Sequence, residues 1–200
     1  MITIKNIIFD LGSVILKGKS VSVLEKLNID DKTHNILKKF FIDCQNLDLG
    51  KESLEEKYIK CNFPKEYDKY KDSLIHYYQH RDINMELINC IHRLKENDYN
   101  IYVLSDNNKE SFNYYKNNSN FKDVDGWVAS YEYSTIKKDG LLFDILMNKF
   151  NLDAQECYFI DDKIENINEA ERHGIKGYIF DEKDDINNLY QDMKKNGIKI

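Results

Sequence analysis

The 200-residue chain is poor in proline and glycine, with one and eight residues respectively. This scarcity excludes collagen-like and low-complexity classes, which depend on one or both of these residues. The four cysteines, Cys44, Cys61, Cys90 and Cys157, are far apart and form no C-x-x-C pair. We therefore expect reduced, mostly buried thiols in a cytoplasmic protein rather than a disulfide framework, with a catalytic thiol as the alternative.

Long apolar runs are also missing, and the densest stretches, such as the one beginning at Asn6, have only the length of a strand. A membrane helix needs about 20 apolar residues, so we expect no membrane partner. The N-terminus carries Lys5 but lacks the apolar centre of a signal peptide. Excess positive charge is absent, because the formal net charge is −6. This argues against nucleic acid as a partner, since such binders neutralise phosphates with Lys and Arg.

Short apolar runs alternate with helical patterns, which is typical of a parallel sheet covered by helices. The expected strands are Thr3–Phe9, Asn100–Leu104, Gly126–Ala129, Cys157–Ile160 and Gly177–Phe180. The expected helices are Asn84–Asn97 with Asn84 as N-cap, Leu141–Phe150, Ile164–His173 and Asp184–Lys195. The predicted fold is therefore α/β, a doubly wound, Rossmann-like parallel sheet of about five strands.

A long stretch between the first two expected strands breaks this alternation. It shows helical periodicity over residues 21–27, 33–42, 52–58 and 66–78, and no convincing strand. A crossover between parallel strands needs only about a dozen residues, so we predict an inserted helical module over residues 17–83. Residues 1–16 and 84–200 then form the core that carries the sheet, and the chain length suits one domain with an insertion.

Reactive side chains follow the expected strands, at the sheet edge where parallel folds collect their functional groups. They are Asp10 after the first strand, Ser105 and Asp106 after the second, Lys137 beyond the third, and Asp161 and Asp162 after the fourth. Carboxylates gathered at one edge repel one another unless a cation lies between them, which predicts a hard divalent ion such as Mg²⁺. A hydroxyl, backbone amides and a lysine can hold phosphate, and a nearby carboxylate can attack phosphorus. The pattern predicts phosphoryl transfer.

These residues lie in segments that resemble, in order, the four signature motifs of the haloacid dehalogenase-like hydrolase superfamily. The segments are Phe9-Asp-Leu-Gly-Ser-Val, Leu104-Ser105, Lys137 and Asp161-Asp162-x-x-x-Asn166-Ile-x-x-Ala170-x-x-x-Gly174-Ile. The helical module lies where that family often inserts a cap, and Leu49-Gly-Lys-Glu-Ser resembles a recurring cap segment. The likeness covers nearly the whole chain. It is strongest to the Asp-x-Gly branch, which includes sugar phosphatases similar to glucose-1-phosphate phosphatase.

The resemblance implies an Mg²⁺-dependent phosphatase that hydrolyses a small phosphometabolite, such as a sugar phosphate, through an aspartyl-phosphate. The implied metal ligands are Asp10, which is also the nucleophile, the backbone carbonyl of Gly12, Asp161 directly or through water, and Asp162. Ser105 and the amide of Asp106 would bind phosphoryl oxygens. Lys137 would neutralise charge on the nucleophile and the transferring group. The implied partner is a small-molecule phosphate ester.

The chain departs from the family pattern, most of all at Gly12. Most family phosphatases have there a second aspartate, a general acid and base worth about 10²–10⁴ in rate. Its loss leaves three alternatives: an easily departing leaving group, a proton from another group or water, or feeble turnover. Asp106 also replaces an asparagine, Lys138 a proline and Ser134 a glycine.

Two other functions stay open. One is a catalytically weak phosphate-binding or regulatory protein, and the other is a 2-haloacid dehalogenase, in which the aspartate attacks carbon without Mg²⁺. The pair Asp161 and Asp162 argues against the dehalogenase. Taken singly, the strand-end acids could be turn or helix caps, and Lys138 offers a competing register for Lys137.

The helical module adds weaker candidates. His76 and His80 have the i, i+4 spacing of two metal ligands on one helical face, but without a third ligand we expect surface or packed histidines. Its tyrosines could stack on a sugar, although we expect most to pack helices together. They are Tyr58, Tyr67, Tyr70, Tyr77 and Tyr78.

Overall fold

The computed structural model describes residues 3–181, 183 and 185–200. Five parallel strands form one sheet in the order β3-β2-β1-β4-β5. The strands are β1 (Asn6–Phe9), β2 (Asn100–Ser105), β3 (Gly126–Ala129), β4 (Cys157–Asp161) and β5 (Lys176–Ile179). The predicted five-stranded α/β fold is confirmed. β1 begins at Asn6 rather than Thr3, because Asn6 is the first residue paired with both β2 and β4.

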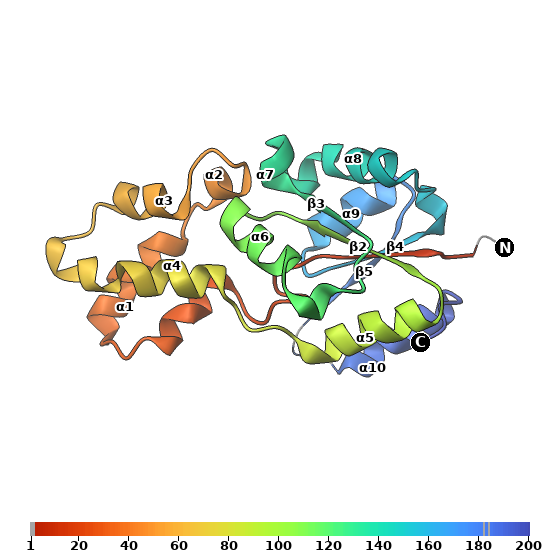
Figure 1. Cartoon of the computed structure of the whole chain (residues 1–200), viewed down its shortest axis with the longest axis horizontal. Coiled ribbons are helices and arrows are strands. Elements are labelled where there is room, and N and C mark those ends of the chain that lie inside the picture. Colours follow the sequence, from red (N-terminus) through yellow and green to blue (C-terminus); the bar gives the residue numbers. More distant parts are fainter. Residues whose placement is uncertain (1–2, 182, 184) are drawn as a thin grey trace.

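Helices cover both faces of the sheet (Figure 1). One face packs against α5 (Met85–Glu96), α6 (Lys109–Lys116) and α10 (Ile186–Lys195), and the other against α8 (Leu141–Phe150) and α9 (Ile164–Arg172). Successive side chains of a strand point to opposite faces. Ile7 and Phe9 accordingly join the first cluster and Ile8 the second. The three central strands β1, β2 and β4 are therefore mostly apolar, because both faces of the sheet are buried there. The predicted start of the last helix, Asp184, lies outside the described residues, as do residues 1 and 2.

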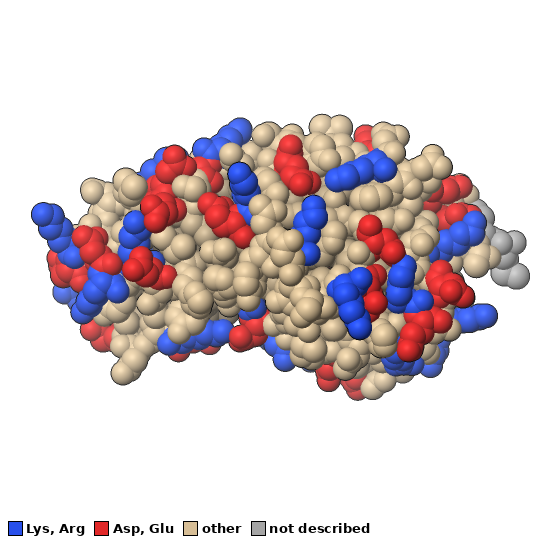
Figure 2. Space-filling view, in the orientation of Figure 1, with Lys and Arg blue, Asp and Glu red and all other residues tan. Residues whose placement is uncertain are grey.

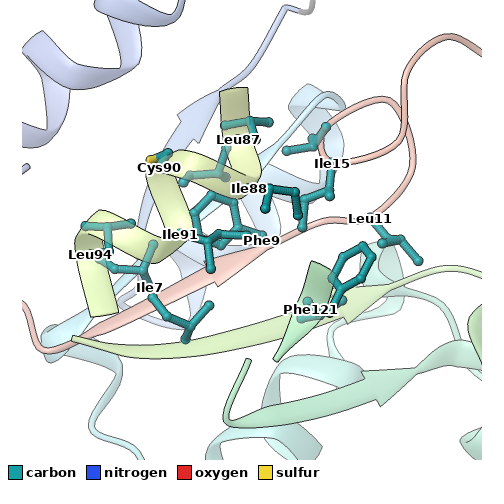
Figure 3. Packing of buried hydrophobic residues seen from close by; sticks show 14 of the residues in the cluster. Ile7, Phe9, Leu11, Ile15, Leu87, Ile88, Cys90, Ile91, Leu94 and Phe121 are labelled. Carbon is teal, nitrogen blue, oxygen red and sulfur yellow. The ribbon is translucent and has the colours of Figure 1, made fainter. Parts of the chain in front are cut away.

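The contact between α5 and β1 shows how the first face is stabilised (Figure 3). The helix turns one apolar stripe onto Ile7 and Phe9, formed by Leu87, Ile88, Cys90, Ile91 and Leu94. Burying one such aliphatic side chain contributes about 1.5–3 kcal/mol. The helix begins at the predicted N-cap, where the Asn84 side chain accepts a hydrogen bond from the Glu86 amide at 3.2 Å.

The stretch between β1 and α5 is helical over its described length. Its elements are η1 (Ser20–Lys26), α1 (Asp31–Leu37), η2 (Lys38–Phe41), α2 (Gln45–Asp48), α3 (Leu54–Cys61), η3 (Lys65–Tyr70) and α4 (Lys71–Gln79). These elements share a hydrophobic cluster of their own, in which Tyr58, Tyr67 and Tyr78 are buried. This separate cluster supports our proposal that residues 17–83 form a helical module apart from the core.

The two connections between the helical module and the core lie side by side. The Lys17 amide donates to the Asp82 carbonyl at 2.8 Å, and the Asn84 amide donates to the Ile15 carbonyl at 2.7 Å. The chain therefore leaves the core and returns to it at one place, where residues 15–17 lie beside residues 82–84.

Short elements complete the fold: η4 (Ser119–Phe121), α7 (Ser130–Tyr133), η5 (Lys137–Asp139) and η6 (Ala154–Glu156). The helices in the described part of the chain all fall short of the length and apolarity that crossing a membrane requires. On the face shown in Figure 2, Lys and Arg side chains are interspersed with Asp and Glu. All four cysteines are free; Cys61, Cys90 and Cys157 are buried, and Cys44 is half-buried.

Candidate active site

The register of the sheet brings the sequence-predicted residues to one edge. Phe9, the last residue of β1, lies level with Val103 of β2 and Ile160 of β4. Asp10, Ser105 and Asp161 follow within two residues of these positions. Lys137 reaches the same edge from η5, two elements beyond β3. Parallel pairing therefore converts positions far apart in the sequence into one cluster.

Lys137 joins two of the acids in a buried ion-pair network. Its Nζ lies 2.8 Å from Asp10 Oδ1 and 2.5 Å from Asp161 Oδ2, and its side chain is 1% exposed. Burial alone would lower the pKa of the Lys137 ammonium, but the carboxylates of Asp10, Asp161 and Asp106 outweigh burial and raise it. The lysine is therefore a fixed positive charge. Of the two adjacent lysines, Lys137 is the one in the site.

Backbone and amide groups hold these charged side chains in place. The Lys137 amide donates to Asp106 Oδ1 at 2.9 Å, which ties η5 to the loop after β2. Asn166, on α9, donates from Nδ2 to both Asp161 oxygens at 3.0 and 3.1 Å. The Lys163 amide donates to Asp161 Oδ1 at 2.8 Å. Asp161 is thus fully bonded and is oriented by the first turn of α9.

Three carboxylates have a geometry that fits a metal ion. Asp10, Asp161 and Asp162 each place a ligand oxygen so that these atoms lie within 4.8 Å of one another. Asp162 Oδ1 is buried and has no hydrogen-bond partner among the described residues. A hard cation prefers such oxygen ligands, and it would satisfy the unpaired Asp162 oxygen. His76 and His80 have rings only 4.3 Å apart, but they are not part of this group.

Two carboxyl groups of the cluster, those of Asp10 and Asp162, have raised pKa values. Burial raises the pKa of Asp10 to about 7, with Lys137 opposing the rise and Asp161 and Asp162 adding to it. Burial and the neighbouring Asp161 also raise the pKa of Asp162. Both shifts express the cost of holding several carboxylates together away from water, a cost that a bound cation offsets.

A cavity of about 410 Å³ opens over the cluster. Five of the sequence-predicted site residues line it: Asp10, Gly12, Asp106, Lys137 and Asp162. The other two predicted residues, Ser105 and Asp161, are outside the lining and fully buried at the strand ends. The Ser105 hydroxyl has no hydrogen-bond partner in the described structure.

The helical module contributes the opposite wall of the cavity; sequence reasoning named its tyrosines, Tyr78 among them, as candidates but missed Phe41 and Asp48. The wall includes Phe41, Cys44, Asp48 and Tyr78, so that one of the module's tyrosines faces the site. Arg81, at the return to the core, also lines it. The sequence signals for this wall were the module's tyrosines and the cap-like segment that begins at Leu49, directly after Asp48.

Burial raises the pKa of Asp48 to about 7, and the charge of Asp106 adds to the rise. Arg81 Nη1 lies 3.6 Å from the position that a Cβ on Gly12 would take. The guanidinium therefore borders the space into which a side chain at position 12 would extend.

Comparisons with known proteins agree with this fold. The family model described as haloacid dehalogenase-like hydrolase matches residues 4–174. The comparison with curated proteins found no matching relative.

Several solved structures share the fold at low sequence identity. A haloacid dehalogenase (HAD) family enzyme of Bacteroides thetaiotaomicron, solved with magnesium and inorganic phosphate, is 23% identical with a TM-score of 0.71, covering 94% of this chain and 99% of that one. A HAD-like hydrolase from Porphyromonas gingivalis is 21% identical with a TM-score of 0.70, covering 96% and 98%. The L-2-haloacid dehalogenase of Xanthobacter autotrophicus is 11% identical with a TM-score of 0.68, covering 99% and 85%.

Proposed function

The chain belongs to the haloacid dehalogenase-like hydrolase family, and on this basis we propose that it is an Mg²⁺-dependent phosphomonoester phosphatase that forms an aspartyl-phosphate on Asp10. The observation that carries the proposal is the contact of Asp10 with the buried Lys137 at the floor of a cavity. A cavity of about 410 Å³ suits a small phosphometabolite such as a sugar phosphate.

In the proposed first step, an Asp10 carboxylate oxygen attacks phosphorus and the ester oxygen leaves. In the second, water attacks the aspartyl-phosphate and regenerates Asp10. Lys137 faces the nucleophile throughout, and its fixed positive charge stabilises negative charge on the transferring group. Ser105 and the Asp106 amide, at the end of β2, are our proposed phosphate ligands.

The proposed metal ligands are Asp10, the Gly12 carbonyl and Asp162, with Asp161 acting directly or through water. When bound there, Mg²⁺ supplies positive charge that offsets both the carboxylates and the phosphoryl oxygens. The oxygen-only donor set and the unpaired Asp162 oxygen support this assignment. The structural neighbour from Bacteroides thetaiotaomicron, solved with magnesium and inorganic phosphate, supports the choice of ion and ligand.

Gly12 favours a second candidate, a phosphate-binding or regulatory protein with little turnover. Glycine has no proton donor to offer the leaving group, so binding without efficient hydrolysis is chemically consistent with this site.

Phosphate release separates the two candidates. The assay uses a panel of sugar phosphates and p-nitrophenyl phosphate, with Mg²⁺ or with EDTA, and Asp10→Asn as the variant. We expect release that requires Mg²⁺ and falls about 10⁴-fold or more in the variant, because the nucleophile is lost.

If even the aryl ester is stable, the phosphate-binding candidate is favoured and the phosphatase is rejected. Activity on 2-haloacids in EDTA would instead identify a dehalogenase.

A further inference from the structure

Hydrolysis of an alkyl phosphate requires a proton donor, and Gly12 cannot be one. Among the described residues that line the cavity, the carboxyl groups are those of Asp10, Asp48, Asp106 and Asp162. Asp10 is the proposed nucleophile and Asp162 a proposed metal ligand. The Asp106 carboxylate accepts a hydrogen bond from the Lys137 amide. Asp48, from the helical module, has no part in the mechanism so far.

Asp48 is held at the cavity by contacts of its own segment with the core. The Ser130 hydroxyl donates to the Asp48 backbone carbonyl at 2.5 Å, and the Ser134 hydroxyl donates to the Leu49 carbonyl at 3.2 Å. Both serines belong to α7 or its end, and Figure 1 shows α2 beside α7. Because the anchor uses the backbone oxygen, the Asp48 carboxyl group is left for the cavity.

The largest charge effects on the Asp48 carboxyl come from residues at the reactive edge of the core. Burial is the main cause of its raised pKa of about 7; Asp106 and Asp10 raise the pKa further, while Lys163 and Lys137 lower it. Asp48, Asp10 and Lys137 line the same cavity, so the Asp48 carboxyl shares this space with the nucleophile and its lysine. At neutral pH such a group has its acid and its base form both populated, as proton transfer in both directions requires.

Other possible donors in the cavity are less suitable. The Tyr115 hydroxyl donates to the Arg81 carbonyl at 2.9 Å, and burial raises its pKa. Burial also raises the pKa of the Cys44 thiol. Both groups are therefore weaker acids than usual. The Asp48 carboxyl, with a pKa of about 7, is better matched to proton transfer at neutral pH.

We propose that Asp48 of the helical module is the general acid and base of this hydrolase, in the role that Gly12 leaves vacant. The proposal rests on the proposed phosphatase function. It makes the module part of the catalytic machinery as well as one wall of the cavity.

The proton transfers balance over one turnover. As the Asp10 oxygen forms its bond to phosphorus, the bond from phosphorus to the ester oxygen breaks and its electron pair stays on that oxygen. The ester oxygen takes the proton of the Asp48 carboxyl and leaves as an alcohol. The Asp48 carboxylate then removes a proton from water as the water oxygen attacks phosphorus. The bond from phosphorus to Asp10 breaks, which releases inorganic phosphate and restores both residues.

The test compares wild type and Asp48→Asn on an alkyl ester, glucose 6-phosphate, and on p-nitrophenyl phosphate, with Mg²⁺. We expect kcat/KM to fall about 10²–10⁴-fold on the alkyl ester and to change little on the aryl ester, because nitrophenolate leaves without a proton. The decline of wild-type kcat/KM for the alkyl ester above pH 7, where Asp48 loses its proton, should be absent in the variant. Asp43→Asn, an exposed aspartate of the same module, is the matched control and should behave as wild type.

Equal losses on both esters would overturn the assignment, because they would indicate a structural role for Asp48. Unchanged alkyl-ester activity in Asp48→Asn would overturn it as well. Wild type that releases phosphate from neither ester would instead reject the proposed phosphatase function, and with it the role of Asp48.

Discussion

Lys137 is the residue on which the charge balance of the site depends. It is buried, and it contacts Asp10, directly after β1, and Asp161, the last residue of β4. A complete ion pair that is buried away from water adds little to the stability of the fold. The loss of one partner is nevertheless costly, because it leaves a buried charge without compensation. The proposed catalytic lysine is thus also expected to stabilise the fold.

Lys137→Met, which keeps an unbranched side chain out to Cε and removes the ammonium group, tests this dual role. In EDTA we expect the free energy of unfolding to fall by about 3–5 kcal/mol, because two buried carboxylates lose their partner. Added Mg²⁺ should recover part of the loss, since a cation at the same carboxylates replaces the missing charge. Urea unfolding with and without Mg²⁺ measures both effects. Lys138→Met, in the adjacent exposed position, is the control. Equal stability of the two variants would contradict the network.

At the scale of elements, the packing of α2 against α7 determines where the Asp48 carboxyl group lies. Gly50 follows α2 with a φ of +67°, and a Cβ there would come within 2.8 Å of the Tyr131 backbone oxygen. No side chain fits without moving one element away from the other. The close approach of these two backbones therefore requires glycine.

Gly50→Ala should therefore reduce activity as well as stability. We expect about 1–2 kcal/mol of destabilisation from the left-handed backbone, and an additional loss of up to about 10²-fold in kcat/KM for an alkyl phosphate, because Asp48 is displaced. Gly197→Ala is the matched control, since Gly197 has a φ of +77° and open space around its Cβ position. Its stability should fall by a similar amount with activity retained. Equal activity of the two variants would show that the contact with Tyr131 does not position Asp48.

At the scale of the whole molecule, we expect the carboxylate edge to couple metal binding to folding. A ligand that binds only the folded state stabilises it, by about 2.7 kcal/mol at a hundred times its dissociation constant. The three acids come together only when β1 and β4 are paired, so the unfolded chain offers Mg²⁺ no comparable site.

Mg²⁺ at saturating concentration should raise the thermal midpoint by roughly 5–10 °C for a chain of this size. Asp162→Asn should lose most of the shift, because it removes a ligand charge, whereas Asp43→Asn should keep it. Thermal unfolding followed by circular dichroism, with Mg²⁺ or EDTA, measures both. A shift of the same size in both variants would place the metal elsewhere.

The sequence by itself determined the sheet and most of the reactive edge. Strand and helix periodicities predicted five parallel strands, and parallel strands must present their carboxyl ends on one side. Asp10, Lys137 and Asp162 could therefore be grouped without coordinates. Two statements drawn from the sequence stay predictions: the separate module at residues 17–83 and the cytoplasmic location.

Only the tertiary structure decided how the helical module meets this edge. Asp48 and Ser130 are 82 positions apart, and no periodicity relates them. The packing of short helices depends on side chains from both partners. Nor could the sequence reveal that Ser105 and Asp161 lie buried beneath the cavity while Asp48 and Arg81 face it. A backbone pattern determines where strands end, whereas the direction of each side chain depends on everything packed around it.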